Sequence, residues 1–178
     1  SAATDYMATP ETITEVYEQQ IAHRTHKIDF LSCLQHSARQ FIIRRPGDRT
    51  EVVAGYPWFG SFMEDTFMAL PGLTLAQGRK EDCIDALDTA IRDIKESGLL
   101  EGSSVPPAVD APLWLFYTLQ QLEGHMTQKE IWIKYGDVMK GILEAYRAGF
   151  YEDIRLHNNG LVWAWADRPL TWMGTLIG

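Results

Sequence analysis

The chain is poor in cysteine and carries no excess of positive charge. Its 178 residues include two cysteines, Cys33 and Cys83, which lie far apart and form no CxxC pair. We therefore expect two buried free thiols and a reducing compartment. Lys and Arg number 16 against 24 Asp and Glu, and the formal net charge of -8 argues against nucleic acid or an anionic membrane as a partner.

Other absences narrow the class further. No apolar run is long enough to span a bilayer, and no signal peptide precedes the first predicted helix, so we expect a cytoplasmic protein. The sequence contains no Gly-rich phosphate loop, no zinc-ligand spacing and no Ser-His-Asp signature. His23 and His26 have no third ligand nearby, so both are expected at the surface. The sequence predicts neither a metal site nor a cofactor.

Helical patterns extend over most of the sequence. With 46% apolar and 22% charged residues, the chain is expected to fold as a single domain over residues 1–178. An Asn-Gly turn within Leu156–Trp163 predicts a small β-hairpin near the C-terminus. The fold class is therefore all-α with one small β-hairpin. Apolar spacing and capping signals predict about six helices, which begin near Thr9, Asp29, Ser61, Arg79, Asp110 and Thr127, the second reaching Ile42.

The stretch Gly55–Gly78 combines an aromatic turn with the third helix. Ser61 is expected to cap this helix with Glu64 in a capping box, Pro71 to kink it, and Gly78 to end it. Glu64 and Asp65 then have two interpretations. They are acids favoured by the positive end of the helix dipole, or they line a sugar pocket beside the aromatic rings.

Asp110 is the best single candidate for chemistry. It follows the Pro-rich loop Leu99–Val109 and precedes an apolar helix that contains Trp114. Partial removal of a carboxyl from water favours its protonated form, which a general acid requires. The alternative is a structural N-cap, because Asp before Ala111-Pro112 is also a strong helix start. The residues alone favour the N-cap.

Three segments, in order, resemble a known family. Ala54–Arg79 (AGYPWFG…EDTFMALPGLTLAQGR) resembles the glucosidase domain of glycogen debranching enzymes, which carry a W-F-G-D-W-G-R-D-T-x-x-A-L-P-G-L run. Val109–Tyr117 (VDAPLWLFY) is similar to the second motif of that family, and Leu170–Met173 (LTWM) to a third. With the lead-in QFIIRRPGDRTEVVAGY, the similarity covers most of residues 28–178.

This resemblance implies a fold, an activity and roles for individual residues. The fold would be about half of an (α/α)6 toroid, in which helix pairs surround a central pocket, as in the six-hairpin glycosidase superfamily. The activity would be that of an amylo-α-1,6-glucosidase, which cleaves α-1,6-linked glucose at branch points of glycogen or another branched α-glucan by inversion. Asp110 matches the general acid, Asp65 the residue that holds the terminal glucose, and Trp58 the aromatic before it. Trp114 would line the pocket.

The chain also departs from the family pattern. Ser61-Phe62-Met63-Glu64 stands where the family has Asp-Trp-Gly-Arg, so Glu64 reverses a charge beside the expected glucose site. Pro107 replaces an Asn-type residue, and Gly174 replaces an Asp. The general base of the family lies in later helices. The chain is therefore expected to be the N-terminal portion of a longer glucosidase domain or a degenerate relative, and to be inactive alone.

We thus expect a glycosidase related to glycogen debranching enzymes. Two other functions are open: a non-catalytic glucan-binding module, favoured by the altered Ser61–Glu64 segment, and a helical interaction scaffold in which the aromatic residues are simply core. A partial toroid would leave apolar helix faces uncovered, so self-association is also expected.

Overall fold

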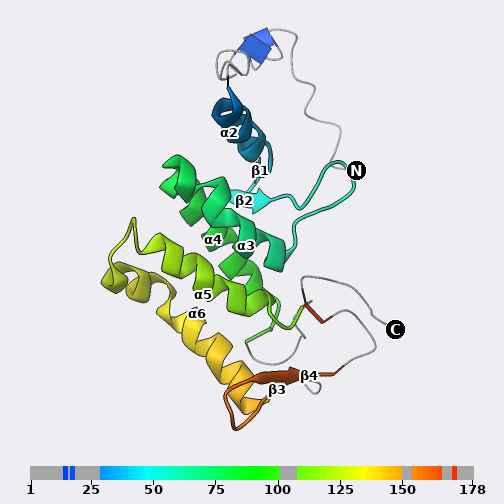
Figure 1. Cartoon of the computed structure of the whole chain (residues 1–178), viewed down its shortest axis with the longest axis vertical. Coiled ribbons are helices and arrows are strands. Elements are labelled where there is room, and N and C mark those ends of the chain that lie inside the picture. The colour runs from blue at the N-terminus through cyan, green and yellow to red at the C-terminus, as the bar shows by residue number, and fades with distance from the viewer. Residues whose placement is uncertain are drawn as a thin grey trace. The chain divides into compact units, whose positions relative to one another are not determined.

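The computed structural model describes residues 14–15, 17–18, 29–100, 108–149, 154–165 and 170–171 (Figure 1). The chain divides into two compact units, residues 1–40 and 41–178, which are considered separately. The helix predicted to begin near Thr9 lies largely outside the described residues, although Thr14, Glu15, Tyr17 and Glu18 are helical. His23 and His26 also lie outside them.

Helix α2, Phe30–Gln40, belongs to the first unit. The Asp29 carboxylate accepts a hydrogen bond from the Ser32 backbone N–H at 2.7 Å, which confirms the predicted cap. This hydrogen bond lowers the pKa of Asp29. The exposed side chains of Phe30, Leu31 and Leu34 give the helix an apolar face.

The prediction that this helix reaches Ile42 is wrong. The helix ends at Gln40, and strand β1, Ile42–Arg45, pairs antiparallel with strand β2, Arg49–Val52. The β-branched pair Ile42 and Ile43 lies opposite Val52 and Glu51, so pairing across the turn outweighs the helical spacing. Gly47 and Asp48 have φ values of 80° and 52°, which reverse the chain between the strands.

The later helices begin near the predicted residues, but the prediction that the third helix runs to Gly78 is wrong, because it ends at Leu73 and Gly78 closes a separate 3-10 helix. The helices are α3 (Met63–Leu73), α4 (Lys80–Glu96), α5 (Ala111–Leu122) and α6 (Gln128–Ala148), with the short 3-10 helix η1 (Leu75–Gln77). Gly78 and Gly149 end their helices with positive φ, and Thr127 with Glu130 forms the predicted capping box. Strands β3 (Ile154–Leu156) and β4 (Val162–Ala164) form the predicted hairpin.

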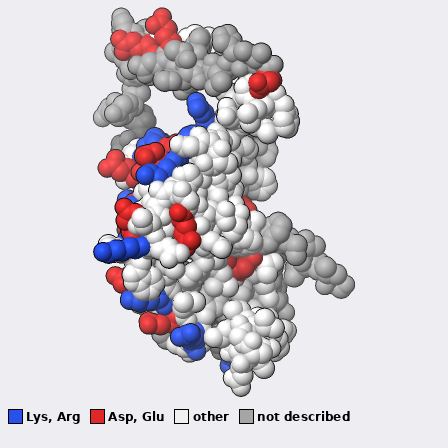
Figure 2. Space-filling model, turned by 60° about the vertical axis from the view of Figure 1, so that its left-hand side comes forward, with Lys and Arg blue, Asp and Glu red and all other residues white. Residues whose placement is uncertain are grey.

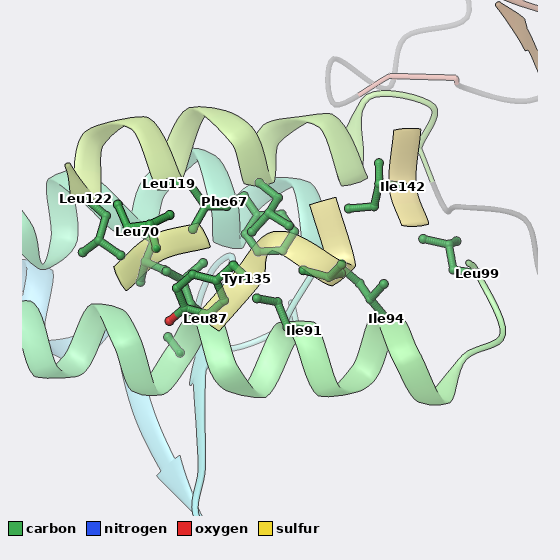
Figure 3. Packing of buried hydrophobic residues seen from close by; sticks show 14 of the residues in the cluster. Phe67, Leu70, Leu87, Ile91, Ile94, Leu99, Leu119, Leu122, Tyr135 and Ile142 are labelled. Carbon is green, nitrogen blue, oxygen red and sulfur yellow. The ribbon is translucent and has the colours of Figure 1, made fainter. Parts of the chain in front are cut away.

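The four long helices form two neighbouring helix hairpins, α3–α4 and α5–α6. Within the core, α3 and α5 run in the same direction: Leu70 and Leu122 lie at one end of the labelled cluster, with Phe67 further along (Figure 3). Helices α4 and α6 run the opposite way, and the Tyr135 hydroxyl of α6 donates to Asp88 of α4 at 3.1 Å. The described chain is thus mostly helical with two small β-hairpins.

One continuous apolar cluster joins the four helices. Its fully buried members come from every helix (Figure 3): Phe67, Leu70, Cys83, Leu87, Ile94, Leu115, Leu122, Tyr135 and Ile142. Burial raises the pKa of the Cys83 thiol to about 11, which keeps it protonated and unreactive at neutral pH. Both cysteines are free thiols as predicted, although Cys33 is only half-buried.

The charged surface is mixed. On the face that Figure 2 shows, acidic and basic side chains are interspersed. Arg44 pairs with Asp82 and Asp85, and Arg49 pairs with Glu51 and Asp93, so β1 and β2 are tied to α4 by charges of opposite sign. None of the helices in the described part of the chain has the length and apolarity that crossing a membrane requires.

Pro71 lies inside α3, where it cannot donate to the Phe67 carbonyl as a helical residue would. The Thr118 hydroxyl of α5 takes over this role and donates to that carbonyl at 2.6 Å, in a fully buried position. The helix continues two residues beyond Pro71 before it ends at Leu73. A single hydrogen bond therefore satisfies the carbonyl that Pro71 leaves free and joins α3 to α5.

We expect Thr118→Val to lower the free energy of unfolding by about 1–3 kcal/mol, because the buried Phe67 carbonyl loses its donor. In a Pro71→Ala background, residue 71 regains an N–H that can bond this carbonyl within the helix. The cost of Thr118→Val should therefore be clearly smaller there. Urea unfolding of the four proteins of this double-mutant cycle measures the difference. Equal costs in the two backgrounds would contradict the assignment.

Candidate active site

The start of α3 is not capped as predicted. The N-cap residue is Phe62, without a side-chain capping bond, so the expected Ser61–Glu64 capping box is wrong. The helix begins one residue later than expected, and the Ser61 hydroxyl lies 3.4 Å from the Thr66 hydroxyl instead. The aromatic turn before it is closed by hydrogen bonds from Ala54 to Gly60 and from Phe59 to Gly55. Trp58 stands out from this turn with 85% of its surface exposed.

Glu64 and Asp65 lie on different faces of α3. Each helical residue turns the chain by about 100°, so Asp65 shares a face with Met68 and Ala69. Those residues and Asp65 line a cavity of about 420 Å³ against Val52, Val53 and Ala54. Glu64 lies within about 60° of Phe67 around the helix, and Phe67 is fully buried in the core. Its Oε2 atom is buried and has no partner among the described residues.

Asp110 occupies the N-cap position of α5, but its carboxylate does not cap the helix. The N-cap interpretation is therefore wrong for the side chain. Oδ2 accepts a hydrogen bond from the Trp114 indole N–H at 3.1 Å, and Oδ1 is buried without a partner in the described part of the chain. The Trp114 ring in turn makes an edge contact with Tyr117. One carboxyl oxygen is thus held, and the other is left with unused hydrogen-bonding capacity.

The turn that carries Asp110 is held from both sides. The Val109 N–H donates to the Leu170 carbonyl at 2.7 Å, and the Val109 carbonyl accepts a hydrogen bond from the Tyr146 hydroxyl. Ala108, Val109 and Ala111 are buried. The second predicted motif therefore lies against the first residue of the third one, while Trp172, Met173, Pro107 and Gly174 are outside the described residues.

Glu64 and Asp110 lie toward the same end of the two parallel helices. The Thr118–Phe67 bond aligns α5 with α3, and Glu64 precedes Phe67 by three residues. Asp110 precedes Thr118 by eight residues. At 1.5 Å per residue, the two acids differ by roughly 7 Å in height, and Trp114 is nearly level with Glu64. This end of the helix pair carries two carboxylates whose buried oxygens have no partner among the described residues, whereas Asp65 lines the cavity on the side of Val52, Val53 and Ala54.

These features define a protein of paired helices in which the parallel helices α3 and α5 begin with acidic residues. Residues 36–177 match the family model of amylo-alpha-1,6-glucosidase, so the chain belongs to that family and is related to glycogen debranching enzymes. Neither the curated proteins nor the solved structures gave a match.

Tyr146 and Leu170 hold the acid-bearing turn, but their roles were not predicted from the sequence. Tyr146 was visible only as one apolar position of a helix, and a helical period says nothing about the partner of a hydroxyl group. Leu170 belongs to the third motif, but its backbone carbonyl carries the contact. A contact made by a backbone carbonyl does not require a particular residue type, so the sequence gives no sign of it.

We expect Tyr146→Phe to lower the free energy of unfolding by about 1–3 kcal/mol, because the buried Val109 carbonyl loses one donor. Tyr117→Phe serves as the matched control, since Tyr117 is 40% exposed. It should cost less than about 0.5 kcal/mol. Thermal and urea unfolding of both variants test this. A Tyr146→Phe protein as stable as the control would show that the hydroxyl does not hold the turn.

Proposed function

We propose that the chain carries the acid half of a glucosidase site, with Asp110 as the general acid. The observation that carries this proposal is the state of the Asp110 carboxyl, with Oδ2 held by Trp114 and Oδ1 buried without a partner among the described residues. A carboxyl oxygen that already accepts a hydrogen bond from an indole N–H is less favoured as the protonated oxygen than one that accepts no hydrogen bond. Oδ1 is therefore the oxygen proposed to carry the proton that the reaction transfers.

The proposed reaction is hydrolysis of an α-1,6-linked glucose with inversion. Asp110 gives its proton to the glycosidic oxygen as the bond to the anomeric carbon breaks. A second carboxylate, outside this chain, takes a proton from the water that attacks the opposite face. Inverting enzymes place their two carboxyl groups about 6.5–9.5 Å apart, which leaves room for this water.

Four residues are proposed to bind the sugar. Glu64 has a buried oxygen without a partner among the described residues, which is suited to accept from a sugar hydroxyl. Trp114 would shape the pocket beside the acid, and exposed Trp58 offers a ring for stacking. Asp65 matches the glucose-holding Asp of the family motif, but its position on the hairpin side of α3 makes Glu64 the nearer candidate in this chain.

Asp110→Asn tests the acid. Asparagine is nearly isosteric and can still accept from Trp114, so the fold should persist, but it cannot supply an acidic proton. In the full-length protein acting on branched glucan, we expect kcat to fall by roughly 10²- to 10⁴-fold. Hydrolysis of α-glucosyl fluoride, whose leaving group needs little protonation, should fall far less. Asp137→Asn, an exposed change on α6, is the control. Unchanged activity of Asp110→Asn on branched glucan would reject the assignment.

The second candidate is a glucan-binding module without catalysis. The charge reversal at Glu64 and the exposed Trp58 favour it. Titration calorimetry with maltooligosaccharides separates the two functions, because binding without turnover in the full-length protein supports the module. A scaffold that uses its aromatic residues only for packing would show no sugar affinity and no effect of Trp58→Ala.

The wider organisation is part of the same proposal. The hairpins α3–α4 and α5–α6 would be two of the six in an (α/α)6 toroid, within a domain longer than residues 1–178 and located in the cytoplasm. Several large apolar side chains are exposed on the described elements, including Trp132, Ile133 and Leu143 of α6. They support self-association of a partial ring, or its completion by further helix pairs.

A further inference from the structure

A cavity of about 530 Å³ lies on the side of α3 that faces β2 and α4. Its walls come from the first three residues of β2, from the residues around the start of α3, and from α4. The volume falls within the range of roughly 300–1,000 Å³ that is typical of small-molecule sites. Asp110, Glu64 and Asp65 do not line it. The cavity is therefore separate from the proposed acid.

One wall of the cavity presents a hydrogen-bond donor of Arg49 next to an acceptor of Asp93, and neither atom has a partner among the described residues. The Arg49 guanidinium donates through Nε to Glu51 at 3.3 Å and through Nη2 to Asp93 Oδ2 at 2.7 Å. These carboxylates raise the pKa of Arg49, so it remains charged. Arg49 Nη1 and Asp93 Oδ1 have no hydrogen-bond partner in the described part of the chain. The ion pair thus keeps one donor position on Arg49 and one acceptor position on Asp93 for a ligand.

The remaining walls are hydroxyl groups and apolar surface. The Ser61 and Thr66 hydroxyls are 3.4 Å apart, longer than the usual 2.7–2.8 Å of an O–H···O bond, so each retains capacity for a ligand. Phe62, 43% exposed, lines the cavity with Met63 and Ala90. A ring with polar edges and an apolar face would use all of these groups.

We infer that this cavity binds a neutral pyranose unit of a glucan, at a site distinct from the one that contains Asp110. Adjacent hydroxyls of a pyranose can accept from Arg49 and donate to Asp93, while the C–H face of the ring packs on Phe62. A charged ligand fits poorly, because Arg49 is already balanced by Glu51 and Asp93. The choice of a glucose-based ligand rests on the proposed function.

Maltose binding to the full chain, measured by titration calorimetry, tests this inference with two matched variants. Asp93 and Asp85 both lie on α4, are ion-paired with an arginine, and have side chains 46% and 45% exposed. Asp85 is outside the cavity. Asp93→Asn should weaken maltose binding about tenfold, and Asp85→Asn should leave it unchanged. Phe62→Ala should also weaken binding. Amide NMR shifts at Thr66 and Ala90 would mark the occupied site.

The inference is overturned if the parent chain does not bind maltose, if Asp93→Asn binds it as well as the parent, or if Asp85→Asn loses as much affinity. Its failure is distinguishable from that of the proposed acid. Asp110→Asn should abolish hydrolysis in the full-length protein and leave maltose binding at this cavity intact. Asp93→Asn should weaken maltose binding at this cavity and leave hydrolysis of a short substrate intact. If Asp93→Asn impaired hydrolysis of a short substrate as strongly as Asp110→Asn, the two sites would not be separate.

Discussion

The hydrogen bond from Thr118 to the Phe67 carbonyl fixes how α5 is aligned with α3 within their shared apolar core. It exists because Pro71 removes the donor that Phe67 would otherwise find in its own helix. A buried carbonyl without a donor is costly, so α5 must approach α3 at this height and with its hydroxyl face inward. That alignment brings the beginnings of both helices, with Glu64 and Asp110, to one end of the core. Pro71, which was expected only to kink α3, thus influences the position of the neighbouring helix α5.

The fold could be predicted from the sequence wherever the signal is local. Thr127 with Glu130 and Gly149 each act within one helical turn, and both marked helix ends correctly. The Asn-Gly turn of the C-terminal hairpin is also local. The prediction failed at Ile42, whose apolar spacing suits a helix as well as a strand. What decides between them is pairing with Val52, ten residues away, which no local pattern contains.

The site was predicted in part for the same reason. Sequence identified the acids at two helix starts, but the residue types did not reveal which face each occupies or which atoms hold it. Asp110 has every property of an N-cap, yet its carboxylate turns to Trp114 one helical turn later. That choice depends on the turn at Val109, which is clamped by Tyr146 and Leu170 from distant parts of the chain. Family membership and local chemistry together singled out Asp110, while its geometry came from tertiary contacts.

Helix α3 lines two different cavities, and helical periodicity explains how its residues reach both. Consecutive residues point about 100° apart, so Glu64 points to a different side from Asp65, which lines the cavity against Val52, Val53 and Ala54, and from Thr66, which lines the cavity beside α4. The segment that departs most from the family pattern, Ser61–Glu64, is where these surfaces diverge. Substitution there can alter the charge beside the acid through Glu64 and the lining of the separate cavity through Ser61 and Phe62. The proposed acid site and the proposed pyranose site therefore depend on different faces of one helix, so a substitution on one face can change one site without the other.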